Sequence, residues 1–572
     1  MDVILLIFVC LITFFFVYKF YGGFISRRIF ELNDQNITPA YEFKDGIDYV
    51  PTRKEIIFGH HFASIAGTGP IVGPAIGVIW GWIPALLWIV LGTLFIGGVH
   101  DFGTLVLSLR NKGKSISEIT GKYINKRTKM AFFSIVFLEL LIVIAIFGLI
   151  MALIFNMFPE SVFPMWFQIP IAIWLGWAIY KKNWNLTLCS IIAVILMYLT
   201  IIVGTYIPLR LQGLDGIPAT GLWTIILLIY CYVAAMLPVT ILLQPRDYIN
   251  SHQLLLALFL LFIGVFASAF RNPAFHLVAP PINLSPIGAP PMVPLLFITI
   301  ACGAVSGFHS LVSSGTSAKQ VRKEQDSQFV GYGGMVTEGI LATLVLIAVS
   351  AGIGIAYKTA DGNILKGVSA WKAHYSSWTT AQGLGSNISA FVIGAGNMLN
   401  SIGIPKTIAI SIMGVFIVSF AGTTLDTATR IQRYVLSELF GKVKIFENRY
   451  FVTFIAVITA GLLAFATGAS GAGALKLWPM FGATNQTLAA LTLLVVTVWL
   501  RSKGGMKFLI SAIPCGFMAL ITTWAIIINQ INFLRTHNYL LSILNLLILA
   551  LNIWIIVEGI IVTFKKENRK TS

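Results

Sequence analysis

The sequence HHFASIAGTGPIVGPAIG, residues 60–77, is an apolar segment crowded with helix-breaking residues. Four glycines and two prolines lie within Gly67–Gly77. Proline removes a backbone donor and clashes with the preceding turn, so a helix formed here is expected to break. Within a bilayer, such a break is tolerated only where it lines a cavity or is buried in protein. The carbonyls and half-helix ends that it frees can bind a substrate or an ion.

The same glycines allow a second interpretation. Gly69, Gly73 and Gly77 form a double GxxxG, a spacing that lets two helices approach closely. A packing role alone would need fewer helix-breaking residues than the Gly-Thr-Gly-Pro run contains. We therefore favour a broken helix.

The composition of the whole chain indicates a membrane protein. Of its 572 residues, 57% are hydrophobic and 11% are charged, and the mean hydropathy is +0.86. A soluble domain is roughly 45–50% apolar and about 25% charged, so these charges are too few to cover the apolar surface of a soluble fold. A cytosolic enzyme, a disordered protein and a secreted disulfide scaffold are excluded. The apolar runs are continuous, which predicts membrane helices rather than a β-barrel.

The apolar runs predict fifteen spans, each of about 20 residues, in a single membrane domain that covers 1–572. The predicted spans are 3–22, 60–80, 82–109, 130–157, 164–180, 184–207, 222–243, 253–272, 293–314, 333–357, 405–428, 451–469, 474–500, 508–529 and 539–563. The first is interpreted as an uncleaved span, because no positive region precedes it and no small-residue cleavage site follows it.

Basic residues gather in alternate loops, as the positive-inside rule requires. This pattern predicts an outside N-terminus and a cytoplasmic C-terminus. The apolar stretch 386–402 would reverse the later loops if it crossed the membrane, so it is predicted to be a re-entrant or surface-lying helix. The net charge of +17 is interpreted as fixing this topology and contacting anionic lipid, not as binding nucleic acid. The five cysteines are scattered without a CxxC motif, so neither a disulfide framework, a metal site nor a cofactor is indicated.

Part of the first motif recurs later in the chain. The pattern His-x5-Gly-Thr begins at His61 and again at His309. In the predicted topology the two copies run in opposite directions, which is the signature of an inverted-repeat transporter. The half-helix ends would suit a substrate carboxylate. We therefore predict that two groups face each other across a central substrate cavity: Gly67, Thr68 and Gly69, and Ser313, Ser314, Gly315 and Thr316.

Polar residues inside the apolar runs are further candidates, because they are costly in a membrane. Thr423, Thr424 and Asp426 offer hard oxygen donors, which suit a proton or a small monovalent cation rather than a soft metal. His309 and Asp101 are assigned to the same coupling role.

The predicted gate lies at an inner span end and comprises His61, Arg246 and Asp247. Anchoring of a loop is an equally good interpretation of Arg246 and Asp247. His100, Glu139 and Glu338 are also intramembrane candidates, for which a structural hydrogen bond is the alternative.

Several longer motifs resemble those of the carbon starvation protein A (CstA) family. They are YEFKDG at 41–46, GHHF at 59–62, GTGP at 67–70, GVHDF at 98–102, QPRDY at 244–248, SSGT at 313–316, GTTLD at 422–426 and WPMFGATNQ at 478–486. The resemblance implies a bacterial inner-membrane transporter with a LeuT-type inverted repeat of the amino acid/polyamine/organocation superfamily. It also implies uptake of peptides during carbon starvation or of pyruvate with protons, and the motifs do not separate these substrates.

With this resemblance, the chain divides into an extra span at 1–22, a first repeat at 60–272, a second repeat at 293–500 and C-terminal spans at 508–563. Seven spans between 60 and 272 exceed the five of a LeuT repeat, so either two helices are inserted or the boundaries differ.

The leading hypothesis is therefore a secondary transporter and not an enzyme. A Walker A motif is absent from the sequence, which argues against ATP as the driving force. A sensor without flux and a histidine-based intramembrane metal or haem protein are the alternatives. The sequence contains neither HExxH nor CxxCH, and the adjacent His60 and His61 point to different helix faces.

Overall fold

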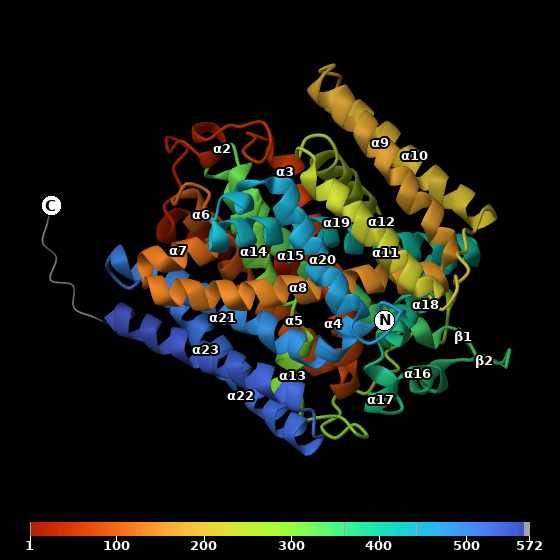
Figure 1. The fold of residues 1–572 in the computed structure, drawn as a ribbon. Helices are drawn as coiled ribbons and strands as arrows, with labels where there is room; N and C mark the ends of the chain where they lie inside the picture. Colours follow the sequence, from red (N-terminus) through yellow and green to blue (C-terminus); the bar gives the residue numbers. More distant parts are fainter. Residues whose placement is uncertain (1, 360, 442, 565–572) are drawn as a thin grey trace, which may run out of the picture.

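Helices form almost the whole of the structure, a computed structural model that describes residues 2–359, 361–441 and 443–564 (Figure 1). Among these residues two short strands, β1 (Tyr357–Lys358) and β2 (Ile364–Leu365), pair as an antiparallel hairpin. In the described part of the chain, twelve helical segments are long and apolar enough to cross a membrane, and a pair of helices bent by 42° makes a thirteenth. The chain is an all-α polytopic membrane protein, as its composition predicts.

The first half of the chain contains the first broken helix, formed by α3 and α4. Its helices are α1 (Asp2–Val17), α2 (Pro39–Glu42), α3 (Lys54–Ala66), α4 (Gly69–Gly77), α5 (Trp82–Leu91), α6 (Gly98–Leu109), α7 (Ile116–Tyr123), α8 (Lys126–Met157), α9 (Val162–Tyr180), α10 (Leu186–Tyr206), α11 (Ala219–Met236) and α12 (Leu243–Arg271). The chain turns between α3 and α4 at Gly67 and Thr68, and Gly67 has a φ of +46°. The break predicted from the glycines and prolines is confirmed at these two residues.

The second half contains the second broken helix, formed by α13 and α14. Its helices are α13 (Met292–Thr299), α14 (Gly307–Gly315), α15 (Gly333–Ser350), α16 (Gly367–Tyr375), α17 (Trp378–Ala381), α18 (Leu384–Ser401), α19 (Lys406–Phe440), α20 (Arg449–Phe465), α21 (Trp478–Ser502), α22 (Leu509–Arg535) and α23 (Tyr539–Phe564).

The position predicted for the second break was wrong. The helix is interrupted between Thr299 and Gly307, within the sequence Ile-Ala-Cys-Gly-Ala-Val-Ser, whereas Ser313, Ser314 and Gly315 continue α14. Ser314 Oγ donates to the carbonyl of Ser310 at 2.7 Å, which satisfies the side chain within the helix.

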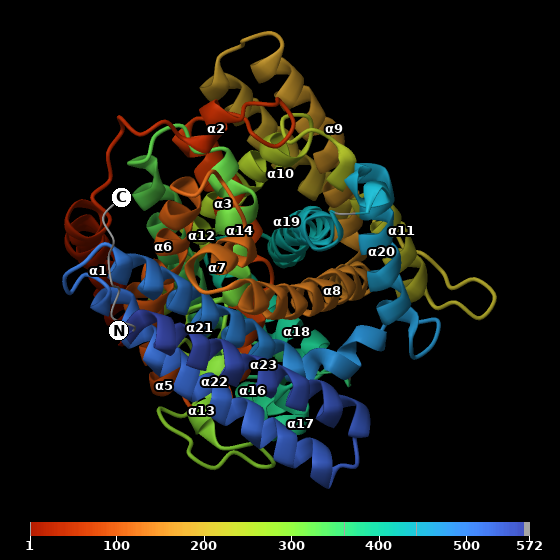
Figure 2. The ribbon, with the colours of Figure 1, turned by 60° about the vertical axis from the view of Figure 1, so that its left-hand side comes forward.

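The same order of elements occurs twice along the chain. Each series starts with a broken helix, continues with a span that contains a π-helical turn and then reaches the longest helices, α8 with 32 residues and α19 with 35. Helices α8 and α19 pack against each other, and Figure 2 shows α19 nearly end-on beside α8. In each series the broken helix also packs on the last helix, α3 on α12 and α14 on α21.

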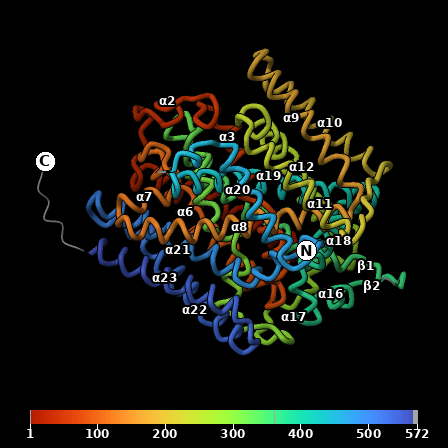
Figure 3. Tube along the Cα trace, viewed as in Figure 1, coloured from red at the N-terminus to blue at the C-terminus, as the bar shows by residue number. Residues whose placement is uncertain are grey.

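Helices α9 and α10 interrupt the first series. They pack on each other as a hairpin that projects from the edge of the bundle (Figure 3). Without them, α8 is followed by α11 and α12, just as α19 is followed by α20 and α21. Helices α9 and α10 are thus the two spans of the first series that have no counterpart between α19 and α20.

All fifteen predicted spans coincide with helical segments, but not every one is a candidate span in the structure. The exceptions are the second broken helix, whose halves are short, and α20, which has 17 residues. Helix α18 covers most of the uncertain stretch 386–402. It is largely buried among α12, α15 and α19 rather than lying on the surface, and it is not among the candidate spans.

The loops predicted to lie on the basic side gather at one end of the bundle. Asp48 binds Arg430 at 2.9 Å, and Glu324 binds Arg110 at 2.7 Å. Burial alone would raise the pKa of Asp48, but Arg430, Arg433 and Lys319 outweigh it and hold that pKa below its ordinary value. Ion pairs therefore join the loop of Asp48 to α19 and the loop of Glu324 to the end of α6, segments that are far apart in the sequence.

Candidate substrate and ion site

The two broken helices touch at their breaks. A Cβ atom added to Gly69 would collide with the side chain of Cys302, which lies in the second break. A Cβ on Gly67 would meet Thr424 Oγ1 of α19 at 2.8 Å. Because Gly67 also has a positive φ, glycine is required there both for its conformation and for this close approach. The centre of the bundle is thus the junction of the two breaks with α19.

A cavity of about 810 Å³ leads to this junction. Helices α4, α13 and α22 and the start of α21 supply most of its walls, and its inner lining includes Gly69 and Cys302. Its mouth holds Trp378, Asn532 and Arg535, and Arg535 is the one charged side chain among the described residues that line it. The cavity is therefore mostly apolar, with one positive charge at its entrance.

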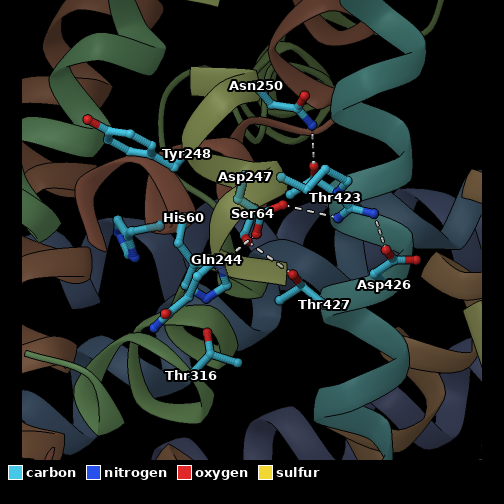
Figure 4. A network of polar contacts seen from close by, with 12 residues as sticks. His60, Ser64, Gln244, Asp247, Tyr248, Asn250, Thr316, Thr423, Asp426 and Thr427 are labelled. Atoms are coloured by element: carbon cyan, nitrogen blue, oxygen red, sulfur yellow. Dashed lines mark hydrogen bonds and ion pairs between the residues drawn. The ribbon is translucent and has the colours of Figure 1, made fainter. Parts of the chain in front are cut away.

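A buried group of charged side chains joins α12 to α19. We call His60, Tyr230, Arg246, Asp247 and Asp426 the arginine cluster. Figure 4 shows how α3, α12 and α19 direct the labelled members of this network toward one another. Arg246 donates to Asp247 Oδ1 at 3.0 Å and also binds Asp426 Oδ2.

Two further contacts complete the arginine cluster. His60 Nδ1 lies 2.6 Å from Asp247 Oδ2, and Tyr230 donates its hydroxyl to Asp426 at 3.0 Å. The side chains of Arg246 and Asp247 are 1% and 0% exposed, so water does not screen this ion pair. One arginine faces two aspartates, which leaves one negative charge when His60 is neutral.

Hydroxyl groups surround the end of α3 next to this cluster. Thr424 donates to the carbonyl oxygen of Ser64 at 3.1 Å, and the hydroxyls of Ser64 and Thr427 are 3.0 Å apart. Thr423 accepts from Asn250 at 3.1 Å. These oxygens are of the type that a proton or a small hard cation prefers.

A second polar group lies on α6, α14, α15 and the second break, and all its members but Cys302 are buried. We call His100, Asp101, Cys302, His309 and Glu338 the histidine cluster. Asp101 binds His100 Nδ1 at 2.7 Å and His309 Nδ1 at 2.9 Å. The other ring nitrogen of His309 lies 3.3 Å from Glu338 Oε2.

The predicted residues are therefore divided between several places. Asp426, Arg246 and Asp247, predicted as coupling and gating residues, form one network. Thr424 lies at the junction of the breaks, and His309 and Asp101 belong to the histidine cluster.

Of the residues predicted to face the first break, Ser313, Ser314, Gly315 and Thr316, two contact other elements instead. Ser314 accepts from the backbone of Ile116, and a Cβ on Gly315 would point at Ile431. Among the described residues, Cys302 is the neighbour of Gly69 from the second broken helix.

Sequence reasoning assigned the gate histidine to His61, but His60 makes the contact with Asp247. His61 Nδ1 instead lies 2.9 Å from Ser317 Oγ, just beyond α14. Tyr230 and Cys302 were missed as members of a site. The sequence gives no local signal for either, because both stand within ordinary apolar surroundings.

The fold and the buried polar junction define a membrane protein of the transporter class. The family model for the carbon starvation protein CstA matches residues 2–525, and the chain belongs to this family.

Curated relatives carry two different names. The chain is 32% identical to the peptide transporter CstA of Helicobacter pylori, over 90% of this chain and 80% of the relative. It is 31% identical to the pyruvate/proton symporter BtsT of Escherichia coli, over 89% and 79%. It is 28% identical to the peptide transporter CstA of Escherichia coli, over 89% and 78%.

The fold is also similar to that of a solved protein. A mutant of a manganese transporter from Eremococcus coleocola superposes with a TM-score of 0.51 at 10% sequence identity, over 91% of this chain and 98% of the other. At this identity the similarity concerns the fold alone.

Proposed function

We propose that this protein is a bacterial secondary active transporter that imports a small carboxylate-bearing nutrient, a peptide or pyruvate, together with a proton or another monovalent cation. The observation that carries the proposal is the cavity of about 810 Å³ that ends where the two broken helices meet. The names of the relatives support both substrates, since one is a peptide transporter and another a pyruvate/proton symporter.

The transporter works in the bacterial inner membrane, with its N-terminus outside and its C-terminus in the cytoplasm. This orientation follows from the basic loops, which gather at one end of the bundle. The cavity opens at the opposite end and so faces the outside. The ion pairs of Asp48 and Glu324 close the cytoplasmic end, as expected of an outward-open state.

The repeated order of elements supports a LeuT-type inverted repeat of ten helices. Helix α1, the α9–α10 hairpin and the C-terminal helices α22 and α23 are additions, which gives about fifteen spans in all. The substrate site of such a transporter lies at the breaks, near the middle of the membrane.

The substrate carboxylate binds at the first break, with Gly67, Thr68 and Gly69. Helix α4 begins at Gly69, and its positive end faces the break. Arg535 at the mouth of the cavity attracts anions toward this site. The side chain of Thr68 is available to donate to a carboxylate, because it makes no capping hydrogen bond to α4.

Coupling is assigned to Asp426 with Thr423 and Thr424. The arginine cluster carries one uncompensated negative charge when His60 is neutral, and an uncompensated buried charge is strongly destabilising. A proton or a cation that binds beside Asp426 supplies the missing charge. It also competes with Arg246, so that ion binding loosens the contact between α12 and α19.

Uptake by proteoliposomes tests this function. Purified protein is given pyruvate, dipeptides and tripeptides under an imposed pH gradient, a sodium gradient or neither. We expect one substrate class to accumulate above its outside concentration under one gradient only. No accumulation of any of these substrates under either gradient would contradict the proposal.

A single substitution tests the substrate site. Thr68→Val keeps the shape of the side chain but removes its hydroxyl, and we expect the uptake rate to fall at least tenfold at unchanged protein level. Thr459→Val is the matched control, because Thr459 lies on α20, away from the cavity, and donates to its own helix at 2.7 Å. Equal uptake kinetics for the two variants would show that the substrate does not bind at Thr68.

A further inference from the structure

Three side chains of metal-binding type meet beside the inner end of the cavity, and one of them, Cys302, lines it. Cys302 lies in the second break, His309 on α14 and Glu338 on α15. One ligand atom from each lies within 4.8 Å of the other two. His309 and Glu338 are buried, whereas Cys302 is partly exposed and lines the cavity.

The orientation of His309 is fixed by hydrogen bonds. Its Nδ1 lies 2.9 Å from Asp101 Oδ2, and the other oxygen of Asp101 is held by His100 at 2.7 Å. A histidine that donates one ring N–H to a carboxylate presents the lone pair of its other nitrogen. This carboxylate–histidine arrangement is the one that orients histidine ligands in metal sites.

The lone pair of His309 Nε2 then points at a second acceptor. Glu338 Oε2 is 3.3 Å away, and neither oxygen of Glu338 accepts a hydrogen bond from any residue that the structure describes. Two acceptors face each other in a buried place, where they need a shared positive charge. A metal ion or a proton can supply it, and the position of Cys302 favours the metal.

We propose that Cys302 Sγ, His309 Nε2 and the Glu338 carboxylate hold one divalent transition-metal ion of the zinc type. Zinc lies about 2.0–2.3 Å from such ligands. Small side-chain adjustments bring atoms within 4.8 Å to that geometry. The mixed sulfur, nitrogen and oxygen donors suit zinc better than magnesium or an alkali ion. A thiolate and a carboxylate also match its two charges.

Three protein ligands leave a fourth position open. Because Cys302 lines the cavity, this position faces the space through which the substrate enters. A water molecule or the carboxylate of the substrate completes the coordination. The site goes beyond the proposed transport function, and its test does not depend on transport.

The first test measures metal binding by the purified full-length chain. Zn²⁺ is titrated in competition with a chromophoric zinc indicator. We expect one ion per chain, and Cys302→Ser, His309→Gln and Glu338→Gln should each weaken binding at least tenfold. Asp101→Asn should weaken it by about 10–100-fold, the usual cost of losing the carboxylate behind a histidine ligand. Cys231→Ser and His374→Gln, which change the same residue types elsewhere, should bind as the wild type does.

The second test uses the thiol of Cys302. All five cysteines lie in the described part of the chain; four are buried, and Cys302 is partly exposed. A water-soluble maleimide should label Cys302, and Zn²⁺ should slow this labelling at least tenfold. His309→Gln and Glu338→Gln should be labelled at the metal-free rate whether or not Zn²⁺ is present. Labelling of one cysteine per chain, rather than of all five, shows that these variants are folded.

Two results would overturn the proposal. If the wild type and the Cys302→Ser/His309→Gln/Glu338→Gln variant bind Zn²⁺ equally, the ion lies elsewhere. If the wild type binds no Zn²⁺ and the metal does not slow labelling, His309 and Glu338 share a proton. Neither result bears on substrate uptake, so the failure of this site is distinguishable from the failure of the transport proposal.

Discussion

The arginine cluster and the histidine cluster are both buried beside the broken helices, but they balance their charges differently. In the first, Arg246 is a permanent cation that two aspartates share. In the second, none of the five members is an arginine or a lysine, and Asp101 and Glu338 are bridged by His309. The permanent cation Arg246 holds its two helices together by fixed ion pairs. A cluster without such a cation needs a proton or an ion that binds and dissociates to balance its negative charge.

Removing the permanent cation Arg246 should give the largest loss of stability and of uptake. Arg246→Met leaves Asp247 and Asp426 buried without compensation, which costs about 3–5 kcal/mol for a buried pair. We expect the largest fall in apparent Tm and a complete loss of uptake. The double variant Arg246→Met/Asp426→Asn removes one of the two stranded charges and should recover part of the Tm. A double variant no more stable than Arg246→Met would contradict the charge balance.

Neutralising the partner of Arg246 should separate coupling from transport. With Asp426→Asn, the cluster is balanced without a bound ion, so exchange of substrate across the liposome membrane should persist while accumulation against a gradient is lost. Asn250→Ala changes a neighbour of Thr423 without altering charge and should keep some accumulation. Normal accumulation by Asp426→Asn would refute the coupling role.

The same kind of change in the histidine cluster should have a smaller effect on stability. His309→Gln loses the contact with Asp101 but strands no permanent cation, so we expect a cost of about 1–3 kcal/mol, below that of Arg246→Met. Apparent Tm values of both variants in one detergent test the comparison. If His309→Gln were the more destabilised of the two, the proposed difference between the arginine cluster, with its permanent cation, and the histidine cluster, with an exchangeable one, would be wrong.

The smallest loss of stability should come from removing an ion pair at the basic end of the bundle. Asp48 has a pKa below its ordinary value of 3.8, so the folded state binds its proton less tightly than the unfolded state does. Its contribution is present above that ordinary value and is lost as the pH falls through the depressed one. Asp48→Asn should cost about 1–2 kcal/mol at pH 7.

Measuring apparent Tm against pH tests this assignment. The gap between wild type and Asp48→Asn should narrow as the pH is lowered below 3.8 toward about 2. A gap that is constant over this range would show that Asp48 acts through packing rather than charge.

Much of the fold follows from local sequence. The first break is encoded locally, because Gly67 can adopt a positive φ and Pro70 fits the first turn of the helix that follows. The spans follow from continuous apolar runs, since each must cross the same thickness of bilayer. The second break was misplaced because its Cys302–Ser306 segment has no proline, whereas the Ser313–Thr316 segment imitates the first motif.

The local sequence determined that this chain spans a membrane, where its helices run, that its first helix breaks and which intramembrane residues carry charge. The tertiary structure alone decided which of these residues meet. Arg246 and Asp426 are 180 positions apart and Asp101 and His309 are 208 apart, and no local pattern records such a pairing. The cost of leaving a charge unpaired in a low-dielectric interior selects these contacts, and that cost depends on the neighbours that folding supplies.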